Sequence, residues 1–422
     1  MLFKYKERLK SNKTVIENFS YVSLLQIFIL IAPLITYPYL VRVLGTDLYG
    51  RVISAQVLAS YASIIILFGT DDVCAKYVSI YRENIEKLSE IVSNILCARL
   101  FLWIACFFLY LTIVLIIPHF RNEFWLYILT YGITLSDLLF PQYFFQGIER
   151  MKVSTLVSLA IKLLFICLVF IIVKDPEDYI FVPILYSIGF FLGGLFSLEY
   201  IKRILKIDFV RPNRSSMFFY LKESFSLFAT NLICTVKDKL NYFIIGAFGM
   251  SNVVVYDLGV KLTALLSRPV TVISTVLFPR FAKSRNMKMI KPVLLFIFTV
   301  TVLLVILTNI FLPQISFFFL HEEVDLMPLR IFTLAPIFLS ISSFVASNVF
   351  VAFGFNKYLL YSILVTTAAY VVLLMVIFFT HHMQSLMAFV ILAVASYFVE
   401  LLYRSLLSLR VAKNYYKQKD EK

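Results

Sequence analysis

The sequence predicts an all-α integral membrane protein with 12 transmembrane helices and with both termini in the cytoplasm. Of its 422 residues, 61% are hydrophobic and 15% are charged, whereas about 25% of a soluble domain is charged. The hydrophobic residues form continuous stretches of the length that a helix needs to cross a bilayer, about 20 residues. The basic residues gather between alternate stretches. This composition excludes a soluble enzyme, a nucleic-acid-binding domain and a disordered chain.

The N-terminal segment is polar, and five of its first 18 residues are basic. The hydrophobic stretch that begins at Phe19 is too long for the central region of a signal peptide, and no small-residue cleavage site accompanies it. We therefore expect a cytoplasmic N-terminus followed by a first membrane span, with no cleaved leader.

Twelve such stretches follow one another along the chain. The expected spans are residues 19–41, 52–76, 91–117, 124–145, 152–173, 178–200, 223–248, 253–279, 291–312, 328–353, 357–380 and 385–407. They are expected to be helices because a lipid-exposed chain must satisfy its own backbone hydrogen bonds. A β-barrel would instead show alternating hydrophobicity in segments of about ten residues.

The distribution of Lys and Arg predicts the orientation of these spans. With the N-terminus in the cytoplasm, 28 of the 39 basic residues fall in cytoplasmic segments, 4 on the other side and 7 within spans. Cytoplasmic loops of membrane proteins carry such an excess of basic residues. The net charge of +14 is therefore mainly a signal of topology, and it requires no nucleic-acid partner.

The chain divides into two halves of six expected spans each. The longest basic loop, residues 200–222, lies at the middle of the sequence. A weak repeat crosses this loop, because Tyr39 to Gly45 is similar to Phe243 to Gly249. An offset of six spans preserves orientation, as in parallel repeats. We expect an N-terminal six-helix bundle at residues 1–210 and a C-terminal six-helix bundle at residues 211–422.

Charged side chains within the spans are the candidates for a functional role, because each costs on the order of 3 kcal/mol at the bilayer centre. The basic ones are Arg99, Lys162, Lys237, Lys239, Lys261, Arg268 and Arg330. The acidic ones are Asp137, Asp238, Asp257 and Glu400. A net positive interior favours an anionic ligand, since buried cations need a counter-charge. Phosphate and diphosphate groups are anions that Lys and Arg commonly bind.

The eighth and twelfth spans carry charges at helical spacing. Asp257, Lys261 and Arg268 lie within about 40° of one another on a helix with 100° per residue. They form either an i,i+4 ion pair with a nearby Arg or a stripe that lines a cavity. Glu400 and Arg404 are expected to form a structural i,i+4 pair.

The remaining charges leave further arrangements open. Lys237 and Lys239 point about 200° apart on a helix, so they cannot both face one cavity, and one of them can pair with Asp238. Lys162 and Asp137 either line a cavity or pair with each other across neighbouring spans.

No catalytic constellation accompanies these charges. The sequence contains no phosphate-binding loop for ATP and no nucleophile elbow, and its cysteines and histidines lack metal-ligand spacing. We therefore predict a protein that is not an enzyme and that uses no cofactor or metal.

Several short motifs resemble those of one family of membrane proteins. The stretch from Tyr37 to Gly50 resembles the first-loop signature of bacterial polysaccharide flippases of the Wzx O-antigen type. Phe68-Gly69 followed by Lys76 is similar to the end of that family's second span, where Arg is more usual at the last position. Residues 238–246 and 256–261 resemble its seventh- and eighth-span motifs, and Phe278 to Arg280 resembles the end of its eighth span.

The resemblance implies a member of the multidrug/oligosaccharidyl-lipid/polysaccharide exporter superfamily. Its fold is two six-helix bundles around a central cavity, and it works by alternating access. The implied substrate is an undecaprenyl-diphosphate-linked oligosaccharide, an O-antigen or capsule repeat unit, moved from the cytoplasmic to the periplasmic leaflet of the bacterial inner membrane. Membrane lipid, a polysaccharide polymerase and a chain-length regulator are the implied partners.

Candidate roles follow from charge and from this resemblance. The predicted substrate-binding residues are Arg42, Lys162, Lys237, Lys261 and Arg268. The predicted charge-orienting or ion-coupling residues are Asp137, Asp238 and Asp257.

Two alternative functions remain open. An ion-coupled multidrug or small-solute antiporter of the same fold would suit an acidic interior better than a basic one. A polymerase or scaffold of polysaccharide synthesis would be expected to carry a large external loop, and the longest expected one, residues 313–327, is short.

Overall fold

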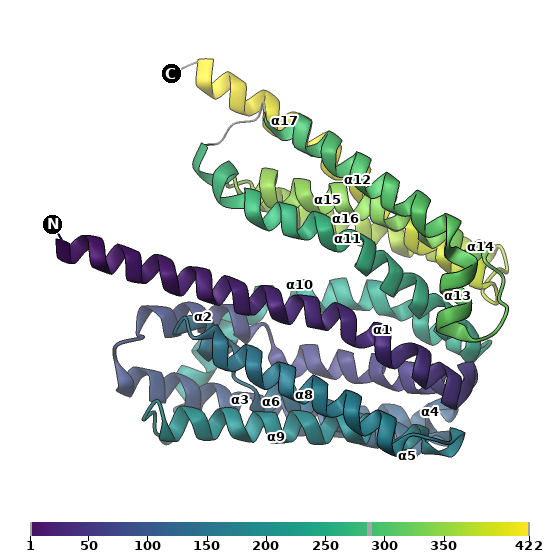
Figure 1. Ribbon diagram of the computed structural model, residues 1–422, viewed down its shortest axis with the longest axis horizontal. Helices are drawn as coiled ribbons and strands as arrows, with labels where there is room; N and C mark the ends of the chain where they lie inside the picture. The colour runs from purple at the N-terminus through teal and green to yellow at the C-terminus, as the bar shows by residue number, and fades with distance from the viewer. Residues whose placement is uncertain (1, 285–288, 421–422) are drawn as a thin grey trace. The chain divides into compact units, whose positions relative to one another are not determined.

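The computed structural model describes residues 2–284 and 289–420, and within these ranges the chain is helical and forms no strand (Figure 1). The helices group into two compact units, Met1–Thr235 and Val236–Lys422. The boundary falls inside one long helix, α10 (Arg214–Gly246). The expected division at residues 210 and 211 stays a prediction.

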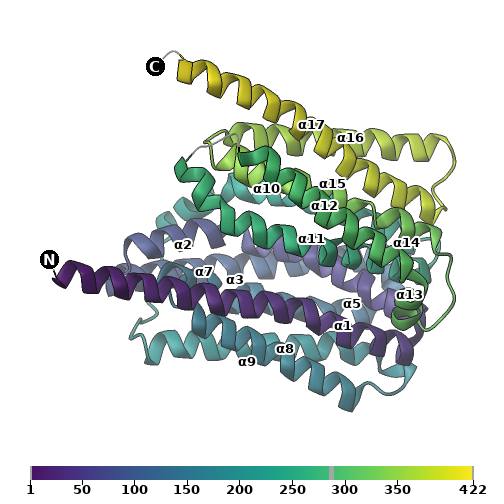
Figure 2. The same cartoon turned by 45° about the horizontal axis from the view of Figure 1, so that its top comes forward.

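The first unit combines long helices with several short ones. Its elements are α1 (Leu2–Leu67), α2 (Thr70–Ile80), α3 (Ile85–Ile116), α4 (Pro118–Asn122), α5 (Phe124–Tyr131), η1 (Gly132–Thr134), α6 (Leu135–Leu139), α7 (Gln142–Gly147), α8 (Met151–Ile172), η2 (Pro176–Ile180) and α9 (Phe181–Arg203). Helix α1 packs against α3, α5 and α8, while α2 packs against α7 and α8 against α9 (Figure 2). The expected fourth span is thus a chain of short helices from α5 to α7.

The first expected span lies in the part of α1 before a break at Gly45, and the second runs from the part of α1 after this break into α2. Gly45 has φ 76° and ψ 164°, a combination that is essentially confined to glycine. A second break separates α1 from α2 at Gly69, which has φ 68°. A Cβ atom there would lie 2.9 Å from the backbone nitrogen of Phe228. Two glycines of the family-like motifs therefore shape the start of the chain.

The basic loop at the middle of the chain is shorter than expected and is anchored to α3. It runs from the end of α9 at Arg203 to the start of α10 at Arg214. The backbone N–H of Val210 donates to Ser93 Oγ at 2.9 Å, and that of Asn213 donates to Asn94 Oδ1 at 2.7 Å. Two polar side chains of α3 thus replace the hydrogen bonds that this loop cannot make within a helix.

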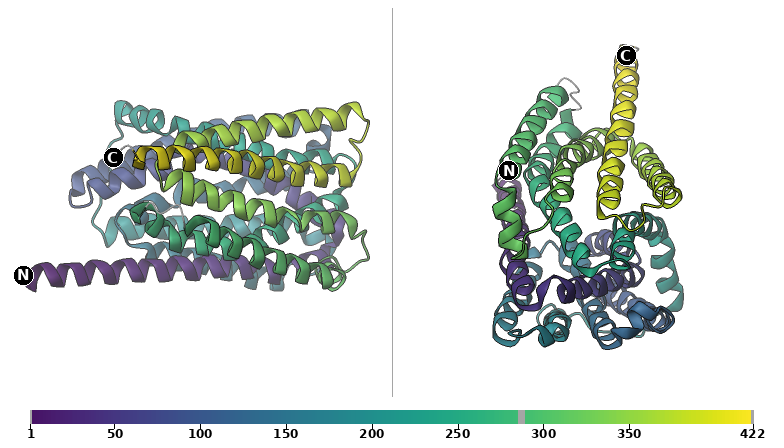
Figure 3. Two further views of the ribbon diagram at one scale, coloured as in Figure 1. Left: turned by 90° about the horizontal axis from the view of Figure 1, so that it is seen from above. Right: turned by 90° about the vertical axis from the view of Figure 1, so that its right-hand side faces the viewer.

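The second unit contains the end of α10 and the helices that follow it. These are α11 (Met250–Ser284), α12 (Ile290–Ile310), α13 (Leu312–Leu320), α14 (Met327–Phe332), α15 (Ala335–Val345), the π-helical turn η4 (Ala346–Val351), α16 (Asn356–Phe379) and α17 (Leu386–Asp420). Helices α15 and α16 both pack against α17, and α11 packs against α14 and α15. Figure 3 shows α16 and α17 running alongside each other.

Ten helical segments of the described residues are long and apolar enough to cross a membrane. One of these segments, Ile31–Ile80, is 50 residues long and contains the break at Gly45, so it covers parts of two expected spans, 19–41 and 52–76. The seventh expected span lies in α10, whose apolar run is interrupted by charges such as Lys237, Asp238 and Lys239. The predicted all-α membrane architecture is confirmed, and the count of 12 spans and the position of the termini stay predictions.

Replacing Gly45 with alanine is expected to destabilise the protein, because an L side chain at this φ and ψ costs about 1–3 kcal/mol. The Gly45→Ala protein should therefore melt at a lower temperature than the parent in detergent solution. Gly246→Ala is the matched control, since Gly246 has no positive φ and a Cβ there would approach only side-chain atoms, the nearest being the end of Met250 at 3.2 Å. Equal melting temperatures for the two variants would contradict the role given to Gly45.

Candidate functional site

A buried arginine holds four helices of the first unit together. Arg99 on α3 is 1% exposed. Its Nε and Nη2 donate to Thr70 Oγ1 at 3.1 and 2.7 Å, and Nη2 also donates to Asp71 Oδ1 at 2.7 Å. Its Nη1 donates to the Asp137 carbonyl at 3.0 Å, and the guanidinium lies over the Tyr143 ring. The protein therefore satisfies this cation by itself, and Arg99 has a structural position.

Asp137 and Lys162 do not pair with each other. Within the described residues, no Lys or Arg nitrogen forms an ion pair with the Asp137 carboxylate, which receives a hydrogen bond from Ser136 Oγ at 3.4 Å. Lys162 is half-buried on α8. The alternative in which the two residues pair is wrong, and their predicted roles in coupling and binding stay predictions.

An asparagine joins three helices of the second unit. Asn241 on α10 is 1% exposed. Its Nδ2 donates to Tyr256 Oη on α11 at 2.8 Å, and its Oδ1 accepts from Tyr370 Oη on α16 at 2.6 Å. Because all three groups are buried and hydrogen-bonded to one another, they form a neutral polar link inside an apolar environment.

The predicted i,i+4 arrangement of the eighth span is an ion pair. Lys261 Nζ pairs with Asp257 Oδ2, and Tyr242 Oη donates to Asp257 Oδ1 at 3.0 Å. Asp257 is 7% exposed and uses both carboxylate oxygens in these contacts. Arg268 is half-buried two turns further along α11. The ion-pair interpretation is therefore confirmed for Asp257 and Lys261.

Lys237 lies between two carboxylates in the second unit. Its Nζ is 3.3 Å from Asp238 Oδ1 and 4.0 Å from Glu400 Oε2, and it lies over the Tyr397 ring. Glu400 also pairs with Arg404 and accepts from Ser342 Oγ at 3.1 Å. The structural pair predicted for Glu400 and Arg404 is thus confirmed.

A small cavity of about 20 Å³ lies beside these groups. Its lining includes Lys237, Asp238, Asn241, Tyr370 and Tyr397. A cavity of this size holds about one water molecule or an ion of similar size. It is far too small for a sugar. The Asp238 side chain is 49% exposed, whereas that of Lys237 is 11% exposed.

The structure brings only some of the predicted residues together. Lys237 and Asp238 share the small cavity, and Asp257 and Lys261 form a pair in the same unit. Arg42 is exposed on α1 and, like Lys162 and Asp137, belongs to the first unit.

Sequence reasoning missed three tyrosines of this cavity, of which Tyr256 and Tyr370 are buried and Tyr397 is half-buried. Tyr256, Tyr370 and Tyr397 all line the small cavity. The hydroxyl of a tyrosine in the middle of an apolar span usually finds a hydrogen-bond partner. The position of these tyrosines within apolar spans could therefore have indicated a polar site. The sequence offers no means of choosing the partner, because it lies on another helix.

More than half of the chain matches one family of known proteins. A family model described as polysaccharide biosynthesis protein matches residues 15–285. The chain belongs to this family. Together with the ten apolar helical segments, the match makes it a multi-pass membrane protein.

Two curated relatives are named as candidate O-antigen transporters. The relative from Shigella dysenteriae is 24% identical over 259 residues, which cover 60% of this chain and 63% of the relative. The relative from Escherichia coli K12 is 23% identical over 290 residues, which cover 66% of this chain and 67% of the relative. The matched region is thus under two thirds of the Shigella protein's length.

Solved structures share the fold at low sequence identity. The lipid II flippase MurJ in an inward closed conformation matches with a TM-score of 0.72 at 14% identity, covering 92% of this chain and 87% of MurJ. An inward-facing multidrug transporter of the MATE family matches with a TM-score of 0.65 at 15% identity, covering 90% of this chain and 96% of that transporter. Both likenesses concern the fold.

Replacing Arg99 with glutamine is expected to destabilise the first unit by about 3 kcal/mol, the lower end of the range for breaking a buried ion pair. The lower end applies because the Asp71 side chain is 36% exposed and keeps part of its hydration. Lys202→Gln, at an exposed position on α9, should change stability by no more than about 0.5 kcal/mol. Melting temperatures and the yield of monodisperse protein measure both effects, and an unaffected Arg99→Gln protein would refute the structural role.

Proposed function

We propose that this protein is a flippase for a lipid-linked oligosaccharide. The substrate would be an undecaprenyl-diphosphate-linked O-antigen or capsule repeat unit. The protein would move it from the cytoplasmic to the periplasmic leaflet of the bacterial inner membrane by alternating access.

The observation that carries this proposal is membership of the polysaccharide biosynthesis protein family over residues 15–285. The names of the two curated relatives, candidate O-antigen transporters, point to the same substrate class. The fold likeness to a lipid II flippase supports it further, because lipid II flipping also moves a lipid-linked molecule across a membrane.

The pairing of acidic side chains favours an anionic substrate over a cationic one. Asp238, Asp257 and Glu400, the acidic residues of the expected spans in the second unit, each have a basic partner. A cationic drug would require a carboxylate that is not already neutralised. The paired carboxylates of this unit therefore argue against a cationic substrate.

The internal cross-links of each unit support a mechanism by rigid-body movement. Arg99 ties together α2, α3, α6 and α7, and Asn241 ties together α10, α11 and α16. In related transporter architectures, alternating access is largely a movement of one bundle against the other. Helices fixed by buried polar contacts move as a body.

Several residue roles belong to this proposal. Arg42, Lys162, Lys237, Lys261 and Arg268 would attract the diphosphate or acidic sugars. Asp137, Asp238 and Asp257 would orient these cations or couple transport to an ion. Asp238 is the best placed of the three for coupling, because it lines a cavity of about 20 Å³, which suits one water-sized ion.

The protein would act as a transporter and not as an enzyme. A polysaccharide polymerase and a chain-length regulator would act on the product, since a repeat unit delivered to the outer leaflet must be polymerised there. The second candidate function is a multidrug or small-solute antiporter, which the fold likeness to a MATE transporter favours.

Expression of this protein should restore surface polysaccharide in a bacterium that makes the matching repeat unit and lacks its own flippase. The lipid-linked intermediate, which accumulates in the deletion strain, should fall at the same time. Drug resistance without restored polysaccharide would support the antiporter instead. Restored export in a strain that lacks only its polymerase would support a polymerase and contradict the proposal.

Replacing Lys237 with glutamine should reduce this export at least about ten-fold, the loss expected for one hydrogen bond to a charged group. The folded protein should remain at the parent level, because Glu400 keeps Arg404 as its partner. Lys222→Gln, at an exposed position of the same helix, should export normally. Export by Lys237→Gln at the parent rate would remove Lys237 from the substrate-binding residues.

A further inference from the structure

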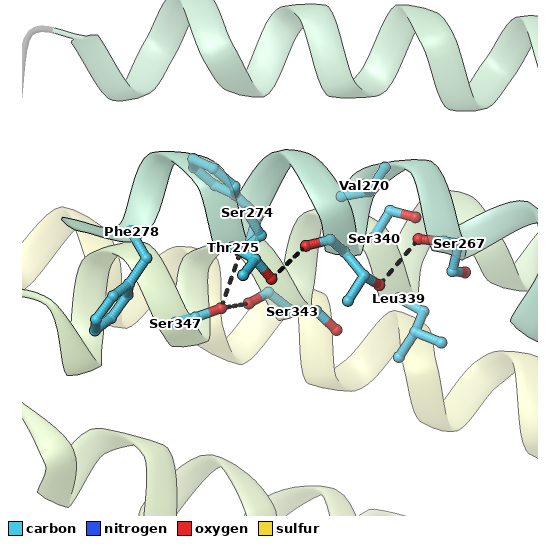
Figure 4. A pocket seen from close by; sticks show the side chains of 11 residues that line it. Ser267, Val270, Ser274, Thr275, Phe278, Leu339, Ser340, Ser343 and Ser347 are labelled. Atoms are coloured by element: carbon cyan, nitrogen blue, oxygen red, sulfur yellow. Dashed lines mark hydrogen bonds between the residues drawn. The ribbon is translucent and has the colours of Figure 1, made fainter. Parts of the chain in front are cut away.

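A pocket of about 310 Å³ lies between α11 and α15 in the second unit (Figure 4). Seven of its eleven lining residues are serine or threonine, and none of the described lining residues is charged. The volume lies at the lower end of the range of small-molecule sites, about 300–1,000 Å³. This pocket is separate from the small cavity beside Lys237, and no residue lines both.

The hydroxyl groups of this pocket present mainly acceptor oxygens. Thr271 Oγ1 donates to the Ser267 carbonyl at 3.2 Å, Thr275 Oγ1 to the Thr271 carbonyl at 2.9 Å, and Ser347 Oγ to the Ser343 carbonyl at 2.7 Å. Each proton is thereby used within a helix. The lone pairs of the Thr271 and Thr275 oxygens remain available, whereas Ser347 Oγ also accepts from Ser274 Oγ at 3.2 Å. A ligand with hydrogen-bond donors would complement them.

One lining hydroxyl is buried and lacks a partner. Ser340 is 2% exposed, and its Oγ makes no hydrogen bond with any described residue. Near the same wall, Asn348 Oδ1 is also buried without a partner, while Asn348 Nδ2 donates to Ser274 Oγ. Such groups are rare in native structures. Asn348 lies in the π-helical turn η4, and π-helical turns occur frequently at functional sites.

The hydroxyls are confined to one side of α11. On its other side, α11 and α12 form a groove of about 400 Å³ whose lining contains only apolar residues, among them Val272, Val276 and Phe296. Serine and threonine are neutral to unfavourable in helix interiors. The polarity of this part of α11 is therefore directed at the pocket and not at the apolar groove.

We propose that this pocket binds a neutral sugar unit of the translocated oligosaccharide. Sugar hydroxyls both donate and accept hydrogen bonds, so they match the acceptor oxygens of the pocket and the unpaired Ser340 hydroxyl. The half-buried Phe278 ring offers apolar surface for the C–H face of a sugar ring. A diphosphate or an organic cation would find no counter-charge among the described lining residues. The biological role rests on the proposed function, whereas the ligand class does not.

Protection of a cysteine placed in the pocket tests the ligand class. Ser343 is exposed in the pocket, so Ser343→Cys can be labelled with a maleimide. The full-length protein also carries Cys167→Ser, which removes an exposed native thiol. It is reconstituted in phosphatidylethanolamine–phosphatidylglycerol nanodiscs. A neutral trisaccharide, maltotriose or chitotriose, should slow labelling by the factor 1 + [L]/Kd, about ten-fold at roughly ten times Kd. Inorganic pyrophosphate should have no effect. Labelling of Glu322→Cys, in the loop after α13, should not change with either probe.

The proposal fails if neither trisaccharide slows labelling of Ser343→Cys. It also fails if pyrophosphate slows that labelling equally, or if the trisaccharides slow Glu322→Cys to the same extent.

Substitution of exposed hydroxyls tests their contribution. Thr275→Val keeps the shape of the side chain, and Ser343→Ala removes only an oxygen. Each substitution should raise the Kd of the trisaccharide roughly two- to ten-fold, as expected for the loss of one hydrogen bond. In the Ser343→Ala protein, the cysteine that reports protection is placed at Ser347 instead. Val276→Ala, in the apolar groove of the same helix, is the matched control and should bind normally.

The same variants separate this inference from the proposed function. If the parent protein fails to restore export but is protected by trisaccharide, the flippase function fails and the pocket stands. If the parent restores export while Thr275→Val and Ser343→Ala export and bind like Val276→Ala, the pocket fails and the flippase function stands.

Discussion

A polar group inside a bilayer must find its partner within the protein, because hydrocarbon offers no hydrogen bonds. This constraint accounts for the helical backbone and also for the positions of the buried charges. The Arg99 guanidinium uses its nitrogens on Thr70, Asp71 and the Asp137 carbonyl. Asp257 likewise uses both carboxylate oxygens. Each such group links the helices that supply its partners, so the cost of burying polarity determines which helices are cross-linked within each unit.

The same constraint limits what the interior can bind. A carboxylate that is already paired with a Lys or Arg is a poor partner for a cationic ligand. In the second unit the carboxylates of the spans are paired, which leaves the cluster poorly suited to a cationic ligand. The substrate that we propose, a diphosphate-linked saccharide, is an anion with a large neutral portion. In this proposal, the charged residues of the second unit correspond to the diphosphate, and the neutral hydroxyls of the α11–α15 pocket correspond to the sugar portion.

Neutral hydroxyls are the less costly way to place polarity in an apolar helix. A serine or threonine returns its proton to the carbonyl four residues earlier, as Thr271 and Thr275 do. The oxygen then stays available at little cost in desolvation compared with a charge. Helix α11 shows both solutions along its length. Its first half carries the Asp257–Lys261 pair, and its second half carries the hydroxyl face.

The sequence alone determined the features that arise within one helix, which are the apolar membrane helices and the possible ion pairs between residues four apart. The apolar stretches predicted the membrane helices. The i,i+4 spacing predicted the Glu400–Arg404 pair and offered the Asp257–Lys261 pair as one of two alternatives, because residues four apart lie on the same face of any α-helix. Contacts between helices could not be predicted in this way. The partners of Arg99, of Asn241 and of the hydroxyls of the α11–α15 pocket come from segments 15 to 129 residues apart. Only the packing of the folded helices decides which of these faces meet.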